Sequence, residues 1–288
     1  MQNKRKKFWI GFGIGVVSVV AIIVSFLLIT RLKTVNVEFV SRLEKQETML
    51  EEGVLDKVLK SGDFDYGKNL LFMNFDDEIK KIEKENPYVK VHEYKRYFPN
   101  EVRITISERV PRFRIQDKDN PNKWYILDSE FKILDVIVGD LKETACGTSN
   151  FYDRTIEISP ESLTLSSYIG EFVNDENERQ NLVNICSGVY AFATDYFVVK
   201  SIKIEKTDEF IFTLTMKNTA NENDNGCKIK IYGTDDIIEK ARRGVAVYHG
   251  KLESSTFEDI SLCEITVKKV SGEFVITSVG FNDQESGA

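Results

Sequence analysis

The longest apolar pattern of the chain lies near its start. Residues Phe8 to Thr30 form 23 consecutive positions without a charge, and the basic residues 4–7 precede them. A helix rises about 1.5 Å per residue, so this stretch spans roughly 35 Å and can cross a hydrocarbon core of about 30 Å. We therefore expect one transmembrane helix over residues 8–30.

The basic residues also indicate an orientation. Lys and Arg beside a first transmembrane segment tend to remain in the cytoplasm, which predicts a cytoplasmic tail over residues 1–7 and an extracytoplasmic remainder. A cleaved signal peptide is the competing interpretation, but its apolar centre is shorter and is followed by a cleavage site flanked by small residues. The length of the run favours an uncleaved anchor.

The next region alternates between strand-like and helix-like patterns. Apolar residues recur at every second position in the strand segments and at a spacing of three to four in the helical ones. We expect Ser61 and Gly62 to stop the first helix, Asn74 to cap the second, and Phe98 to Asn100 to form a turn. The expected elements are a strand over 34–39, helices over 47–60 and from Asn74 to about 86, and strands over 88–97 and 101–108.

The remaining chain is rich in strand patterns. Its last two strands are separated only by Ser271 and Gly272, which is typical of a hairpin turn. The expected elements are strands over 124–127 and 131–138, a helix over 175–193, strands over 198–204, 210–216 and 228–232, a short helix over 235–243, and strands over 263–270 and 273–279.

Charge and cysteine content narrow the possible functions. The formal net charge is −7, which argues against binding to nucleic acid and against adhesion to anionic lipid. The four cysteines, Cys146, Cys186, Cys227 and Cys263, form no CxxC motif and have no neighbouring His that would complete a zinc site. They could form two disulfides or remain small buried apolar residues.

The chain lacks a recognisable catalytic set. Its two histidines, His92 and His249, are expected on a strand surface and in a turn, outside any catalytic motif. The acidic pairs Asp76–Asp77 and Asp235–Asp236 open expected helices, where the helix dipole favours carboxylates without a catalytic need. We therefore expect no enzymatic activity, no cofactor and no metal.

Four short segments of this region form a distinctive set: Gly67–Phe72, Pro87–Val89, Tyr97–Ile104 and Glu108–Pro111. Together they resemble the POTRA module of the bacterial division proteins FtsQ and DivIB. In that family a short cytoplasmic tail and one transmembrane helix precede the POTRA domain, and a larger β domain follows, often opened by a strand similar to Trp124–Asp128. The order of these parts agrees with nearly the whole chain.

The resemblance implies an α+β fold and a set of domains. We expect a POTRA domain of β-α-α-β-β order over residues 34–111, a larger mixed β domain with flanking helices over 112–280, and a flexible tail over 281–288. It also implies a noncatalytic component of the divisome at the division septum. The implied partners are FtsL-like and FtsB/DivIC-like coiled-coil membrane proteins, with a septal peptidoglycan synthase as a further candidate.

In the family, the partner surface lies at the late strands of the β domain. An exposed strand edge can accept a partner segment as an added strand, with alternate side chains providing specificity. The alternative is that these residues complete the core, while charged side chains on the edge strand prevent pairing with another chain. The matching positions are Leu262, Glu264, Ile265, Thr266, Val267, Glu273, Val275 and Thr277.

Two other classes of function compete with a division adaptor. A membrane-tethered sensor would hold a cell-wall ligand in a pocket of the second region, although the seven-residue cytoplasmic tail argues against inward signalling. A cell-wall hydrolase would need a nucleophile with a base, a carboxylate pair or a metal, and no such set is recognisable in the sequence.

Overall fold

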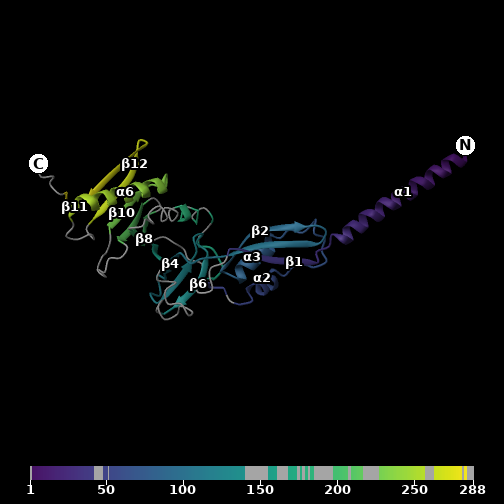
Figure 1. Cartoon of the computed structure of the whole chain (residues 1–288), viewed down its shortest axis with the longest axis horizontal. Coiled ribbons are helices and arrows are strands. Elements are labelled where there is room, and N and C mark those ends of the chain that lie inside the picture. Colours follow the sequence, from purple (N-terminus) through teal and green to yellow (C-terminus); the bar gives the residue numbers. More distant parts are fainter. Residues whose placement is uncertain are drawn as a thin grey trace. The chain divides into compact units, whose positions relative to one another are not determined.

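A computed structural model shows two compact units, Met1–Arg109 and Val110–Ala288. It describes residues 2–41, 48–50, 52–139, 155–160, 168–173, 176, 179–180, 182–184, 197–206, 209–216, 227–256, 263–280 and 282–283. The division lies close to the boundary expected between residues 111 and 112. Figure 1 shows the two units and the long N-terminal helix.

The first element is a helix, α1 (Gln2–Ile29). Its apolar part, Phe12–Ile29, has a mean hydropathy of 2.9 and no residue buried within the protein, so by length and composition it can cross a membrane. The helix begins before the expected residue 8 and includes the basic residues of the expected tail. Among the residues that the structure describes, this is one helix long and apolar enough to cross a membrane, and its place near the N-terminus suggests single-pass anchoring.

The rest of the first unit has the expected β-α-α-β-β order. Its elements are β1 (Thr34–Ser41), α2 (Val54–Gly62), α3 (Asp76–Glu85), β2 (Val89–Tyr97) and β3 (Glu101–Glu108). The strands form one sheet in the order β1-β3-β2, in which β3 pairs with β1 in parallel and with β2 in antiparallel orientation. Strand β3 is therefore the centre of this sheet.

The core of the first unit lies between the sheet and its two helices. Val102, Ile104 and Ile106 of β3 are fully buried, together with Phe75 and Ile82 of the segment that forms α3. This confirms the alternation predicted for residues 101–108 and the apolar face predicted for the second helix. The opposite positions of β3 face away from the core and include Arg103, which lies near Glu38 and Glu101.

Both helices of the first unit differ at their ends from the expectation. Helix α2 begins only after Gly53, whose φ of 77° is left-handed, and ends at Gly62. Asp63, also left-handed, caps its C-terminus, so Ser61 and Gly62 still belong to the helix. Residues 48–50 are not helical, although Leu50 belongs to the core. A left-handed glycine interrupts the helical hydrogen bonding even where the apolar spacing continues.

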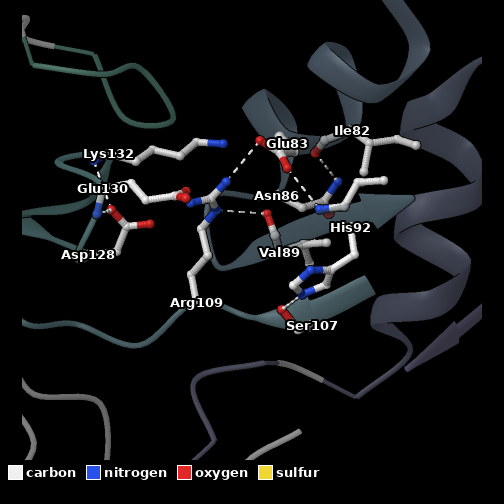
Figure 2. Close-up of polar contacts among 11 residues, drawn as sticks. Ile82, Glu83, Asn86, Val89, His92, Ser107, Arg109, Asp128, Glu130 and Lys132 are labelled. Atoms are coloured by element: carbon white, nitrogen blue, oxygen red, sulfur yellow. Dashed lines mark hydrogen bonds and ion pairs between the residues drawn. The ribbon is translucent and has the colours of Figure 1, made fainter. Parts of the chain in front are cut away.

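Two charged residues at the end of β3, Glu108 and Arg109, connect the elements of the first unit. The guanidinium of Arg109 bonds Glu83 of α3 at 3.0 Å and the carbonyl of Val89 at 3.2 Å (Figure 2), and its side chain is only 3% exposed. The carboxylate of Glu108 accepts hydrogen bonds from the hydroxyl of Thr48 and from the backbone N–H of Met49. The Glu-Arg pair of the expected family segment therefore has a structural role.

The second unit is built on a nine-stranded sheet. The strand order is β13-β12-β10-β9-β8-β7-β4-β5-β6. The strands are β4 (Phe113–Gln116), β5 (Lys123–Leu127), β6 (Ile133–Val138), β7 (Ile156–Pro160), β8 (Phe197–Lys206), β9 (Glu209–Met216), β10 (Cys227–Tyr232), β12 (Glu264–Val270) and β13 (Glu273–Val279). The fold is therefore a mixed α+β one, with a β-rich second unit.

A long helix, α6 (Ile237–Ser254), packs against strands β10 and β12. Gly244 permits this close approach, because a Cβ atom there would lie 2.7 Å from a methyl carbon of Ile229. The helix was expected to end at Arg243, and His249 was expected in a turn. Both expectations were wrong, since the helix continues through His249 to Ser254.

Other parts of the second unit were not foreseen. Strands β4 and β7, of four and five residues, were not predicted from the sequence. Of the helix expected over 175–193, most positions lie outside the described residues; those that the structure does describe, 176, 179–180 and 182–184, are helical. In the expected flexible tail, β14 (Asn282–Asp283) pairs with β11 (Ser255–Thr256), so these two residues are held in a strand.

The cysteines divide into two groups. Cys227 and Cys263 are buried thiols in the core of the second unit, which agrees with the buried apolar alternative for these two. Burial raises the pKa of Cys227 well above its ordinary value. Cys146 and Cys186 lie outside the described residues, so their disulfide state stays open.

Candidate partner-binding surface

The surface expected to bind partners begins at the hairpin of β12 and β13. Ser271 and Gly272 connect the strands with φ values of 52° and 88°, as a two-residue turn of matching twist requires. The antiparallel register runs from Glu264 opposite Val279 to Val270 opposite Glu273. The predicted hairpin and its turn are confirmed.

Strand β12 lies inside the sheet rather than at its edge. It pairs with β13 on one side, and on the other side residues 264–267 pair with residues 228–231 of β10. The side chains of Ile265 and Val267 are fully buried in the core that includes Tyr248 of α6. These two residues therefore hold the sheet to the helix and do not present side chains to a partner.

Among the described strands, β13 stands at one end of the nine-stranded sheet. Its residues alternate strictly between exposed and half-buried positions, so Glu273, Val275 and Thr277 face solvent. Val279 is exposed as well, at 60%. An exposed strand with a free edge can accept an added strand through its backbone N–H and C=O groups.

The half-buried side of β13 packs toward α6. The guanidinium carbon of Arg243 lies 4.3 Å from the centre of the Phe274 ring, and the ammonium of Lys269 lies 5.6 Å from it. A cation over an aromatic face is attracted by the negative charge density of the ring. Residues of α6 and β12 thus fix the edge strand in place.

The open face of the sheet beside β13 is polar and basic. Thr266 is half-buried and Lys268 is exposed on β12, and the neighbouring Lys230 of β10 forms an ion pair with Glu209 at 2.6 Å. The hydrogen bond to Glu209 raises the pKa of Lys230 above its ordinary value. A shallow pocket on this face is lined by Tyr232, Gly233, Asp235, Thr266, Lys268 and Lys269.

The acidic pair before α6 serves the fold. Asp235 bonds the fully buried ammonium of Lys240 at 2.7 Å, and this hydrogen bond lowers the pKa of Asp235. The same ammonium donates to the carbonyls of Tyr232 and Gly233. Asp236 forms an ion pair with Lys269, so both carboxylates tie α6 to the ends of β10 and β12, as a structural role predicts.

Other strand edges are less suitable for a partner. At the opposite end of the sheet, the first residue of β6, Ile133, already bonds the backbone of Gly170 and Glu171. In the first unit, edge strand β2 carries the charged residues Lys90, Glu93, Lys95 and Arg96, which discourage edge pairing. Of the edge strands β2, β6 and β13, β13 best combines an open edge with exposed apolar side chains.

The expected site residues therefore separate into three groups. Glu273, Val275 and Thr277 lie exposed on the edge strand, Glu264 and Thr266 are half-buried, and Ile265 and Val267 are buried. Leu262 lies outside the described residues. Partner binding by these positions stays a prediction, now centred on β13. Val279 was not singled out, although the alternation of residues 273–279 extends to it.

The described residues offer little for catalysis. Within those ranges, no group of three or more His, Cys, Asp or Glu side chains could hold a metal ion. His92 is exposed on β2 and its Nε2 lies 2.6 Å from the hydroxyl of Ser107 (Figure 2), which confirms its expected position on a strand surface.

Comparison with known proteins identifies one part of the chain. Residues 55–109 match the family model described as the POTRA domain of FtsQ type. The match begins within α2, and the structure adds β1, which pairs with β3 along its length. No curated protein matches the chain.

Proposed function

We propose, on the premise that the FtsQ-type POTRA domain marks this chain as an FtsQ/DivIB family protein, that it is a noncatalytic component of the divisome. In this proposal it binds FtsL-type and FtsB/DivIC-type membrane proteins outside the cytoplasm and thereby influences septal peptidoglycan synthesis. The family supports a role in cell division, and the apolar helix supports membrane anchoring.

One observation carries the binding part of the proposal. The domain after the POTRA domain ends in an exposed edge strand, β13, with Val275 and Val279 at the surface. A partner segment that adds to this edge gains main-chain hydrogen bonds and buries both valines. Lys268 and Glu273 beside them are exposed and can select a register by charge.

A co-purification experiment tests this surface. The full-length chain would be co-expressed with the FtsL-type and FtsB/DivIC-type proteins of its own source, and the double variant Val275→Asp with Thr277→Asp would be compared with it. Partner binding would remove the two new carboxylates from water, which costs free energy, so most of the co-purification should be lost. The matched control is Val138→Asp, an exposed valine on β6 at the other end of the same sheet.

The two outcomes are distinct. Loss of both partners in the β13 variant, with the control unaffected, would support the proposal. Retention of both partners by a folded β13 variant would remove this strand from the interface and leave the family role without a binding site at this position.

Location and orientation need a separate experiment. The four basic residues before the apolar run favour a cytoplasmic N-terminus, and the family suggests the septum. A fluorescent protein fused to the N-terminus should therefore fluoresce as a band at the septum of dividing cells. A uniform membrane signal from a functional fusion would instead favour a membrane-tethered sensor.

A further inference from the structure

The exposed apolar side chains of the first unit outside α1 are concentrated in two loops. Among its described residues, seven large apolar side chains are exposed beyond the helix, and five of them lie within residues 66–72 and 97–98. The most exposed is Phe72, at 74%. Aromatic residues gathered in this way, outside any core, indicate a contact surface.

Both loops are bonded to the chain segment that leaves α1. In the first loop, Gly67 donates to the carbonyl of Leu32 at 2.9 Å, and Leu70 donates to that of Thr30 at 2.8 Å. In the second loop, the carbonyl of Asn100 accepts from the N–H of Lys33 at 2.9 Å. The two aromatic loops therefore lie at the end of the helix that can cross the membrane.

Asn69 fixes this arrangement at the helix terminus. Its amide nitrogen donates to the carbonyl of Leu27 and to the hydroxyl of Thr30, both at 2.8 Å. The last carbonyls of a helix have no partner within the helix, so this side chain satisfies one of them from the first loop. The loop is thereby held beside the last turn of α1.

The charges at this end differ from those of the whole chain. Arg31, Lys33 and Lys68 are exposed beside the loops together with one carboxylate, that of Asp65, so these four residues are net basic, whereas the chain as a whole is acidic. Glu101, directly after the turn of the β2–β3 hairpin, accepts a hydrogen bond from Asn36 and lies near Arg103. Basic and aromatic side chains at the end of a membrane-spanning helix match the headgroup region of a bilayer.

We propose that residues 66–72 and 97–100 seat the POTRA domain on the membrane surface from which α1 emerges, with Tyr66, Phe72 and Phe98 in the lipid headgroup region. The inference rests on α1 spanning the membrane. It does not depend on the partners of β13, because the two surfaces belong to different units. The domain then has a defined height and tilt over the bilayer instead of swinging on a hinge.

The test uses the full-length chain in nanodiscs of equal parts phosphatidylcholine and phosphatidylglycerol that contain nitroxide-labelled lipid. A fluorophore is attached to Asp65→Cys, an exposed position of the first loop, in a background in which Cys146 and Cys186 are replaced by Ser. The buried thiols of Cys227 and Cys263 should not compete for the label. Quenching of the fluorophore reports the contact of the loop with lipid.

Removing the aromatic rings distinguishes loops that insert into the headgroup region from loops that only lie close to the membrane. In Phe72→Ser with Phe98→Ser, quenching should fall by about half, because the loops lose the apolar area that holds them in the interface. Val40→Ser removes a comparably exposed side chain from the far end of β1 and should leave quenching unchanged. The double variant Phe72→Trp with Phe98→Trp should retain the quenching of the parent.

Equal quenching in the parent and the double serine variant would overturn the proposal. Equal quenching would mean that the loop stays close to lipid only because α1 tethers it. It would also be expected if the aromatic side chains bind a protein partner and not lipid. Hydrogen exchange of β2 and β3 in each variant verifies that the domain remains folded. The rescue by Trp distinguishes a lost ring from a lost fold.

Discussion

At the scale of single residues, a buried ion pair connects three elements of the first unit. Arg109 joins the end of β3 to helix α3 through Glu83, and the other carboxylate oxygen of Glu83 accepts a hydrogen bond from the backbone N–H of Val91. The pair therefore connects three elements through two side chains. A nearly buried guanidinium stays favourable only while every one of these partners is in place.

Replacing Arg109 by Lys should destabilise the first unit by about 3 kcal/mol, because one ammonium cannot reproduce the paired contacts of a guanidinium and leaves Glu83 undersatisfied. Hydrogen exchange of β2 and β3 in the full-length chain measures this loss. The control is Arg103→Lys, whose charge partners lie at 3.7 and 3.9 Å on the open face of the same strand, and it should change stability by less than about 0.5 kcal/mol. Equal effects of the two variants would contradict the assigned role.

A second residue-scale prediction concerns pH. Asp117 accepts a hydrogen bond from the hydroxyl of Tyr125 at 2.8 Å, and this bond is the main cause that lowers the pKa of Asp117 to about 2. An unfolded Asp titrates near about 3.9, so the folded state binds this proton less readily. The stabilisation is fully present above pH 4 and is lost as the pH falls toward 2.

The pH profile of Asp117→Asn provides the measurement. Between pH 4 and pH 2, the free energy of unfolding should fall less steeply in this variant than in the parent, because the variant lacks the titrating carboxylate. Fluorescence of Trp124, in the neighbouring strand β5, can follow unfolding of the second unit. Asp119→Asn, in the same turn, should keep the slope of the parent, and identical slopes for all three proteins would exclude Asp117 as the cause.

At the scale of elements, the sequence predicts strands better than helix ends. Alternation identified β1, β2, β3 and the β12–β13 hairpin, because one face of each strand packs on a core and the turns carry distinctive residues. Helix boundaries depend on local backbone conformation that apolar spacing does not encode. Gly53 delays the start of α2 although the apolar spacing begins before it, whereas Gly244 and Gly250 lie within α6 and do not interrupt it.

The candidate site shows the same limit. Sequence located the hairpin and its exposed alternation, but the position of a strand within a sheet depends on pairing between distant segments. The pairing of β12 with β10 joins residues separated by more than thirty positions. A local sequence pattern does not predict which distant strand a segment pairs with. This is why Ile265 and Val267 were expected at an interface and instead lie in the core.

A charged substitution should affect stability very differently in the two strands of the hairpin. Ile265→Asp places a carboxylate in the core and should cost about 4 kcal/mol or unfold the second unit. Thr277→Asp, on the exposed face of β13, should change stability by less than about 0.5 kcal/mol. Chemical denaturation followed by Trp124 fluorescence measures both, and a stable Ile265→Asp variant would refute the placement of β12 inside the sheet.

At the scale of the whole molecule, each of the two units has its own sheet and its own core. The core of the first unit contains residues from Leu32 to Ile106, and that of the second contains residues from Phe113 to Val267. No strand of one sheet belongs to the other. Such a division predicts that the membrane anchor and the POTRA domain form an independent folding unit, to which the β domain is added.

A truncation after Arg109 should therefore leave a folded, membrane-bound fragment. Residues 1–109 retain all three strands of the first sheet and the Arg109–Glu83 pair, so the amides of β2 and β3 should keep the hydrogen-exchange protection that they have in the full chain. A truncation after Pro99 removes the central strand β3, which pairs with both β1 and β2, and should abolish that protection. If the longer fragment were also unprotected, the first unit would depend on the second for its stability, and the separate cores would not correspond to separate folding units.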